Sequence, residues 1–370
     1  PSLSPDEKFI VYTKKVNDNW DVYRYDRFSK QIERMTTHTS RDFSPVYDRN
    51  NILYFTSDRA RKGEFAIYYL SNNGVRTYLR QKGTSFYAPR FSGLKDINLQ
   101  LEKPMTGEPR SSFGAIEHKG KVYIAGGHQG PEHTYPPESF TNRVTYYDLK
   151  QKKWYETTPR NYKCHGFALA AYGDYIYAFG GFAYSQHHEP KWKSLNVIER
   201  YNINTKKWDV IGQMPRNRSN IVVQIEDKAY LIGGWDSTPK YKGDIDGRFH
   251  DEIDVFDFET ELMIEYPDRL PLRRRAFSAV SKNGKIYLVG GISESGSHFS
   301  LLDNVTEYDP ITGDFKDVSK LPFPTFAPAA GVLGDRLYVF GGMFKTGKWS
   351  YEYVPHIYQF DFKYKKWSHT

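Results

Sequence analysis

The segment Lys285–Gly291 reads Lys-Ile-Tyr-Leu-Val-Gly-Gly and ends on a pair of glycines. A run of β-branched and aromatic residues that stops at glycine predicts a short buried strand. The same signature, with tyrosine three residues before the pair, recurs at steps of 54, 53, 57 and 51 residues. The five pairs are Gly126-Gly127, Gly180-Gly181, Gly233-Gly234, Gly290-Gly291 and Gly341-Gly342. Spacing of this kind indicates a repeat protein, in which each unit packs on the next.

Each repeat has a second half that predicts a hairpin. About twenty residues after every glycine pair, an aromatic residue precedes Asp or Asn, and a large apolar residue follows six positions later. Turn residues such as Asn-Thr-Lys-Lys lie between them, so the large residue is expected to open the outer strand. These large residues are Trp154, Trp208, Met263, Phe315 and Trp367.

The double glycine, the Tyr-Asp pair and the following Trp resemble the Kelch repeat over about 108–370. The copies at Met263 and Phe315 depart from the motif by lacking Trp. The resemblance implies five four-stranded blades of a β-propeller. Their expected ranges are 108–158, 159–213, 214–270, 271–322 and 323–370.

The first 92 residues follow a different period. Pro1, Pro45 and Pro89 are 44 residues apart, and strand-like runs follow the first two. With Ser-Pro-Asp ahead of a strand, this segment resembles the TolB-like β-propeller repeat and implies two blades in 1–92. Residues 93–107 are interpreted as a junction.

The composition limits the classes of fold that the chain can adopt. The chain has 370 residues, one Cys, 16% aromatic residues and a net charge of +8, and it has no apolar run that could span a bilayer as a helix. We therefore expect an all-β chain that forms a single β-propeller of seven blades, two TolB-like and five Kelch. Six or eight blades, or a separate TolB-like propeller completed by upstream sequence, remain alternatives. The glycine pairs are interpreted as structural, because no Gly-x-Gly-x-x-Gly precedes a helix.

One face of such a ring is expected to carry the function. With strands a to d numbered outward, the long b–c loops and the d–a crossings share one face, and long loops in compact repeats are usually functional. The crossings are rich in arginine, which can hold carboxylate, sulfate or phosphate through forked hydrogen bonds. The Kelch resemblance implies partner binding for Arg110, Arg160, Arg216, Arg218, Arg273 and Arg275. The alternative is that these arginines pair with acidic residues of the next blade and lock the ring.

Aromatic residues of the b–c loops complete the candidate surface. Exposed aromatic rings stack on sugars or anchor protein partners, although rings in loops also pack against blade edges. The candidates are Tyr184, Trp192, Trp235 and Trp349. No metal or cofactor is expected, because His187, His188 and Glu189 lie on one loop without a third ligand at fixed spacing.

The main functional hypothesis is a non-enzymatic binding or scaffold propeller for a protein or glycan partner. The TolB-like resemblance implies a periplasmic or cell-surface place in a bacterial envelope complex, with a signal sequence missing from this chain and only indirect membrane association. A nucleic-acid partner is not expected, because no aromatic strand platform accompanies the basic residues. The alternative is a Kelch-type mutarotase or epimerase that acts on an acidic sugar, and a third hypothesis is a purely structural subunit.

Overall fold

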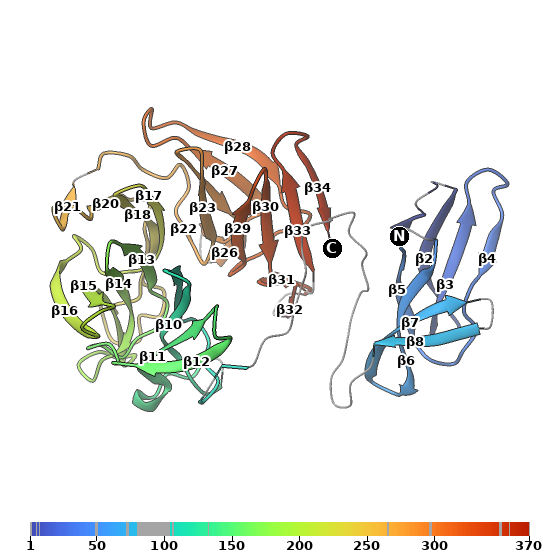
Figure 1. Cartoon of the computed structure of the whole chain (residues 1–370), viewed down its shortest axis with the longest axis horizontal. Helices are drawn as coiled ribbons and strands as arrows, with labels where there is room; N and C mark the ends of the chain where they lie inside the picture. The colour runs from blue at the N-terminus through green and yellow to red at the C-terminus, as the bar shows by residue number, and fades with distance from the viewer. Residues whose placement is uncertain are drawn as a thin grey trace. The chain divides into compact units, whose positions relative to one another are not determined.

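The structure is a computed structural model that describes residues 2–4, 6, 8–48, 51–71, 74–79, 104–105, 107–131, 133–264, 266–295, 298–347, 350–354 and 356–369. Most of the junction predicted at 93–107 therefore lies outside the described residues. The chain divides into two compact units (Figure 1). The first comprises 1–99 with 338–341 and 354–370, and the second comprises 100–337 with 342–353.

Two antiparallel four-stranded sheets occupy the first 79 residues. Apolar residues at alternating positions of these strands form a buried core, and Val11, Val22 and Phe55 are completely buried. Sheet 1 consists of β1 (Ser2–Leu3), β2 (Phe9–Val16), β3 (Asn19–Asp26) and β4 (Ile32–Arg34), and sheet 2 of β5 (Asp42–Tyr47), β6 (Leu53–Arg61), β7 (Glu64–Ser71) and β8 (Gly74–Leu79).

Five further sheets follow, and in each of them four strands lie side by side in the order in which they occur along the chain. Sheet 3 contains β9 (Gly114–His118), β10 (Lys121–His128), β11 (Phe140–Asp148) and β12 (Lys153–Thr157). Sheet 4 contains β13 (Ala168–Tyr172), β14 (Tyr175–Tyr184), β15 (Trp192–Asn202) and β16 (Lys207–Gln213). Sheet 5 contains β17 (Ser219–Ile225), β18 (Lys228–Asp236), β20 (Ile253–Asp257) and β21 (Leu262–Ile264), and β19 (Arg248–Phe249) also pairs with β18.

Sheet 6 contains β23 (Ser278–Lys282), β24 (Lys285–Val289), β27 (Asn304–Tyr308) and β28 (Phe315–Lys320). Sheet 7 contains β29 (Ala329–Leu333), β30 (Arg336–Phe340), β33 (Ile357–Asp361) and β34 (Lys366–His369). Within the second unit the first strands β9, β13, β17, β23 and β29 are successive neighbours, so they form the inner layer. The all-β, multi-bladed propeller class predicted from the sequence is confirmed.

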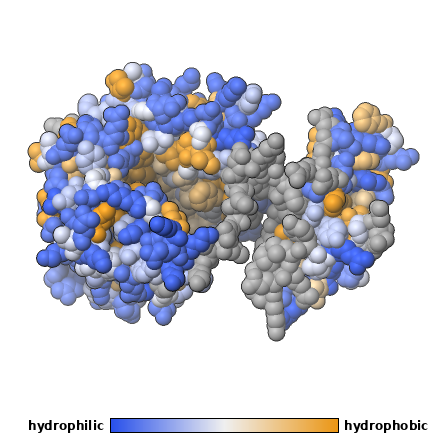
Figure 2. Space-filling model, in the orientation of Figure 1, coloured by the Kyte–Doolittle hydropathy of each residue, from blue (hydrophilic) through white to orange (hydrophobic). Residues whose placement is uncertain are grey.

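The described residues contain one short 3₁₀ turn, η1 (Pro137–Ser139), as their helical element. Two b–c segments expected as loops contain hairpins instead: β25 (Ile292–Ser295) with β26 (His298–Leu301), and β31 (Met343–Lys345) with β32 (Tyr351–Tyr353). The first hairpin forms because β25 also pairs with β22 (Arg274–Arg275) of the preceding crossing. Hydrophilic side chains cover most of the visible surface of both units, and hydrophobic residues appear in small groups (Figure 2).

The predicted outer hairpins are present. Tyr147 lies directly opposite Trp154 across β11 and β12, with ring centroids 5.2 Å apart. Asp148 closes the turn between them, because its Oδ1 accepts hydrogen bonds from the backbone N–H groups of Lys150 and Gln151. The same cross-strand pairing recurs in the other four copies.

The glycine pairs connect one sheet to the next. A Cβ placed on Gly180, whose φ is +65°, would lie 2.4 Å from the carbonyl oxygen of Arg218 in the following crossing. The N–H of Gly181 donates to that same oxygen at 3.1 Å. Gly127 donates in the same way to Cys164, and Gly291 to Thr325. Only glycine permits both the left-handed backbone and the close approach, as the structural interpretation of these pairs requires.

Candidate functional site

Three of the predicted arginines are buried within the second unit. Arg160 is 1% exposed and donates from Nε and Nη2 to one carboxylate oxygen of Glu199, at 2.9 and 2.5 Å. Its guanidinium also lies 3.8 Å from the centre of the Phe167 ring. Arg160 precedes sheet 4 and Glu199 belongs to β15, so this contact fixes the crossing to the sheet that follows it. Arg160 and Glu199 both lie in the predicted blade 159–213, so the acid that holds Arg160 does not come from a neighbouring blade.

Arg218 and Arg110 occupy similar interior places. Arg218 is completely buried, pairs with Asp254 through Nη2, and donates to the carbonyl of Gly233 at 2.9 Å. Arg110 is 8% exposed and donates to the hydroxyl of Thr145 at 2.7 Å. Burial lowers the pKa of Arg110 to about 10, and it stays a cation at neutral pH. A ligand would have to displace internal contacts to reach either guanidinium.

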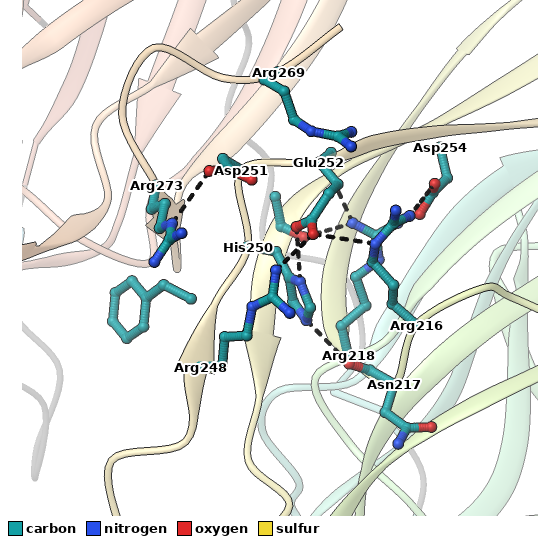
Figure 3. Close-up of polar contacts among 12 residues, drawn as sticks. Arg216, Asn217, Arg218, Arg248, His250, Asp251, Glu252, Asp254, Arg269 and Arg273 are labelled. Carbon is teal, nitrogen blue, oxygen red and sulfur yellow. Dashed lines mark hydrogen bonds and ion pairs between the residues drawn. The ribbon is translucent and has the colours of Figure 1, made fainter. Parts of the chain in front are cut away.

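A second group of charges surrounds Glu252 (Figure 3). Arg248 Nη2 donates to Glu252 Oε1 at 2.6 Å, and Arg216 Nε lies 3.2 Å from the same oxygen. His250 Nδ1 lies 2.9 Å from Oε2. Burial alone would raise the pKa of Glu252, but the hydrogen bond with His250 and the charge of Arg248 outweigh it and lower the pKa to about 2. Glu252 therefore neutralises its neighbours as a permanent carboxylate at neutral pH.

The remaining arginines of Figure 3 lie at the surface. Arg273 is 46% exposed in its side chain, and its Nε lies 3.2 Å from Asp251 Oδ2. Its Nη1 lies 3.5 Å from Glu294, so Arg273 also has acidic partners. Arg269 is exposed, and its Nη1 donates to the carbonyl of Asp268 at 3.5 Å.

Arg275 differs from all of these. With the described residues its side chain makes no hydrogen bond and no ion pair, and its Nε is buried without a partner. Instead its guanidinium lies 4.1 Å from the Trp235 ring centre and 4.9 Å from that of Phe249. Burial lowers its pKa to about 10, so the group is charged at neutral pH. Aromatic rings hold this cation in place and leave its hydrogen-bonding capacity unused.

An aromatic cluster built from sheets 3, 4 and 5 lies beside Arg275. Tyr135, from the b–c loop of sheet 3, meets Trp192 edge-on at 5.5 Å and stacks near His165 at 5.8 Å. Phe182 stacks against Trp235 at 5.9 Å. Burial raises the pKa of Tyr135, and the positive charge of Arg275 opposes that rise. We call Tyr135, His165, Phe182, Trp192 and Trp235 the aromatic cluster.

The sequence-predicted aromatic residues are only partly brought together. Trp192 and Trp235 belong to the aromatic cluster, and Tyr184 lies opposite Trp192 at the end of β14. Trp349 lies outside the described residues. His165 was not predicted for this site, and Nε2 of its ring is buried without a hydrogen-bond partner among the described residues. Burial and the nearby His128 lower the pKa of His165 to about 3, so its imidazole is neutral.

The remaining His and Cys residues do not form a metal site or a reactive thiol site in the described residues. Within the described part of the chain, no three His, Cys, Asp or Glu side chains are grouped so that they could hold a metal ion. His188 bonds through Nδ1 with Ser185 at 2.8 Å, and Cys164 is a buried thiol whose pKa is raised by burial. No described helix has the length and apolar character needed to cross a membrane.

Residues 122–370 match the family model of the Attractin/LZTR1 beta-propeller. Because that match begins at 122, the TolB-like resemblance of 1–92 stays a prediction. Among solved structures, the one titled "Structure of YjhT" superposes with a TM-score of 0.56 over 88% of this chain and 97% of that one. At 16% sequence identity, this is a likeness of fold.

Curated relatives are similar over part of their length. Kelch-like protein 40 of Xenopus laevis is 25% identical over 56% of this chain and 30% of the relative. Kelch repeat and BTB domain-containing protein 12 of Homo sapiens is 21% identical over 74% of this chain and 44% of the relative. Beta-scruin of Limulus polyphemus is 26% identical over 64% of this chain and 25% of the relative. The chain thus spans less than half of each of these proteins.

Proposed function

The chain belongs to the Attractin/LZTR1 β-propeller family, and from this premise we propose that its loop-bearing face binds a carboxylate-bearing ligand, an acidic glycan. The observation that carries the proposal is Arg275, a guanidinium held between Trp235 and Phe249 without an acidic partner. Arg216 and Arg273, the other arginines of the face that are not fully buried, already have carboxylates beside them. Arg275 is therefore the cation with the most to gain from an anionic ligand.

The neighbouring residues suit a sugar acid. A planar guanidinium matches the two oxygens of a carboxylate and can donate two parallel hydrogen bonds to them. The faces of tryptophan and tyrosine pack well against the apolar C–H side of a sugar ring, and the half-buried Tyr135, Trp192 and Trp235 supply such faces. The cation and the apolar surface would then select for a ligand that combines one charge with one ring.

Binding is favoured over catalysis by the protonation states. General acid–base catalysis works best when a group has a pKa near the working pH. The pKa of Glu252 is lowered to about 2 and that of His165 to about 3, so neither group is matched to proton transfer at neutral pH. We therefore retain a binding module as the main proposal.

The binding experiment compares matched charge changes. Isothermal titration with sialic acid as the probe should show at least a tenfold loss of affinity for Arg275→Gln, since charged hydrogen bonds contribute about 1.5–3 kcal/mol each. Lys150→Gln removes the same charge from a turn between β11 and β12 and should bind as the wild type does. Equal affinity for Arg275→Gln and wild type, with both folded by circular dichroism, would contradict the proposal.

A second candidate function is a mutarotase for an acidic sugar. One observation favours it: the neutral ring of His165 has an unpartnered Nε2 beside Tyr135 in the aromatic cluster. Opening a sugar ring requires proton transfer at the anomeric hydroxyl and the ring oxygen, and the His165 imidazole could relay it only if contact with the acidic sugar raised its pKa. Exchange spectroscopy on sialic acid, which measures how fast its two anomers interconvert, tests this function. If the anomers interconvert no faster with the protein than in buffer, the mutarotase hypothesis is excluded and the binding proposal is unaffected.

Partner and location are also proposals. We propose a protein partner because the Kelch resemblance implies partner binding. We place this partner in an envelope complex because the first 92 residues resemble TolB-like repeats. Cell fractionation of the full-length protein tests the location. Cross-linking followed by mass spectrometry tests the partner, and recovery of the protein alone from the envelope fraction would speak against a complex.

A further inference from the structure

One position in sheets 3 to 6 always places a polar side chain against a buried arginine. The position lies on the third strand, opposite the residue two places before the glycine pair, and its register is identical in the four sheets. Each arginine comes from the crossing that precedes the sheet and is at least nine-tenths buried. The four combinations are Arg110 with Thr145, Arg160 with Glu199, Arg218 with Asp254 and Arg274 with Thr306.

Two of these positions neutralise the arginine with a carboxylate. Glu199 does so in sheet 4 and Asp254 in sheet 5. In sheet 3 neutral acceptors serve both terminal nitrogens of the arginine, since Arg110 donates at 2.7 Å from Nη2 to Thr145 Oγ1 and from Nη1 to the carbonyl of Arg143, and only its Nε has no partner among the described residues. A buried guanidinium without such partners would lose its hydration and receive nothing in exchange.

Sheet 6 does not provide these partners. Arg274 is 1% exposed, and its Nη2 reaches Asn304 Oδ1 and Thr306 Oγ1 only at 3.4 and 3.5 Å. Its Nε and Nη1 are buried and make no hydrogen bond with the described residues. Burial lowers the pKa of Arg274 to about 10, so it carries its charge at neutral pH. Sheet 6 thus contains a buried cation with unused N–H donors.

The nearest carboxylate is engaged elsewhere. Asp317 Oδ1 accepts hydrogen bonds from Thr306 Oγ1 at 2.6 Å and from Asn304 Nδ2 at 3.1 Å. Asp317 itself is exposed. It influences Arg274 through its charge but makes no hydrogen bond with the guanidinium. The Thr306 hydroxyl therefore separates the cation from the acid that could have neutralised it.

We propose that Arg274 binds a small monovalent anion of the halide class, chloride in a saline medium, inside sheet 6. The unused groups are all donors, so the ligand must be an acceptor. One positive charge calls for one negative charge, and the negative Asp317 nearby disfavours a dianion such as sulfate. The near-complete burial of Arg274 restricts the ligand to a small ion. The site is internal and does not depend on the proposed glycan-binding face.

Thermal unfolding of the whole chain tests the site. A ligand that binds only the folded state raises the unfolding temperature with its concentration, so sodium chloride should raise Tm above sodium gluconate of equal ionic strength by about 2–5 °C. Thr306→Asp supplies the carboxylate that Asp254 provides in sheet 5, and it should abolish the chloride effect. Thr145→Asp, the same change at the equivalent position of sheet 3, should retain it.

Bromide provides a direct measurement that does not require a variant to fold. In wild-type crystals grown in sodium bromide, an anomalous peak is expected within hydrogen-bond distance of Arg274 Nε or Nη1. Equal Tm in chloride and gluconate, together with water instead of bromide at Arg274, would overturn the proposal. A folded Thr306→Asp protein that keeps the full chloride effect would overturn it as well.

Discussion

Arg160 and Glu199 form an ion pair in which both side chains have no exposed surface. Arg160 reaches this position from four residues before Cys164, whereas in sheets 5 and 6 the arginine itself stands at the place of Cys164, sixteen or fifteen residues before the glycine pair. Cys164 Sγ lies 3.3 Å from Arg160 Nη1, so the small thiol leaves room for the displaced guanidinium. The arginine of sheet 4 therefore comes from a different position of the repeat, but its positive charge lies in the interior as it does in sheets 5 and 6.

Glu199→Gln is expected to destabilise the protein strongly. Removing one member of a buried ion pair leaves the other charge uncompensated, at a cost of about 3–5 kcal/mol in the free energy of unfolding. Urea denaturation followed by tryptophan fluorescence measures the loss. The double variant Arg160→Met, Glu199→Leu removes both charges and should recover most of it. A Glu199→Gln protein as stable as wild type would contradict the role given to the pair.

Gly180→Ala and Gly173→Ala form a matched comparison. Both glycines have positive φ, +65° and +59°, but a Cβ meets the Arg218 carbonyl at 2.4 Å in the first and nothing within 4 Å in the second. The first change should cost about 2–5 kcal/mol and the second about 1–2 kcal/mol, because only the first adds a collision to backbone strain. Calorimetric Tm values rank the two. Equal losses would mean that the contact between sheets 4 and 5 is not tight.

Acid should weaken the Glu252 cluster. Because the folded-state pKa of about 2 lies below the unfolded reference of 4.5, the ionised carboxylate contributes stability above pH 4.5 that is lost as pH falls toward 2. At neutral pH the contribution amounts to about 3 kcal/mol. The difference in unfolding free energy between wild type and Glu252→Gln should therefore shrink from pH 6 to pH 2. A difference that stays constant over this range would refute the shifted pKa.

Tyr135→Ala should weaken sialic acid binding about tenfold, whereas Tyr135→Phe should bind as wild type does. The ring makes the contacts with Trp192 and Phe182, and its loss removes an aromatic face and loosens the cluster beside Arg275. Titration calorimetry on the three proteins checks this. Loss of binding in the Phe variant would shift the role from the ring to its hydroxyl.

The repeat signals are sufficient to predict the all-β propeller class. Tyr147 and Trp154 predict a hairpin because turn residues lie between them, and the structure places the two residues directly opposite each other across that hairpin, with their rings tilted at 54°. The hairpin β25–β26 could not be foreseen, because its pairing with β22 depends on a crossing about twenty residues earlier in the chain. Contacts between segments that are distant in sequence leave no local pattern.

The candidate site was only partly predictable. In Arg273-Arg274-Arg275 the sequence shows three similar cations, yet Arg274 of β22 is buried and Arg273, which precedes the strand, lies at the surface. Our prediction included Arg273 and Arg275 but could not foresee that aromatic rings, and not acids, hold Arg275. The partners Glu199, Asp254 and Glu252 carry no motif of their own. They gain their roles from the register of the strands that bear them.

The bond from the second glycine of a repeat to the carbonyl of the next crossing runs one way along the chain. Gly127, Gly181 and Gly291 each donate to the crossing of the repeat that follows, although the side chains at the receiving positions, Cys164, Arg218 and Thr325, are unlike one another. A gene segment encoding one repeat could therefore be duplicated or excised by recombination without reshaping the joints on either side. This backbone contact thus allows the array to gain or lose whole repeats during evolution.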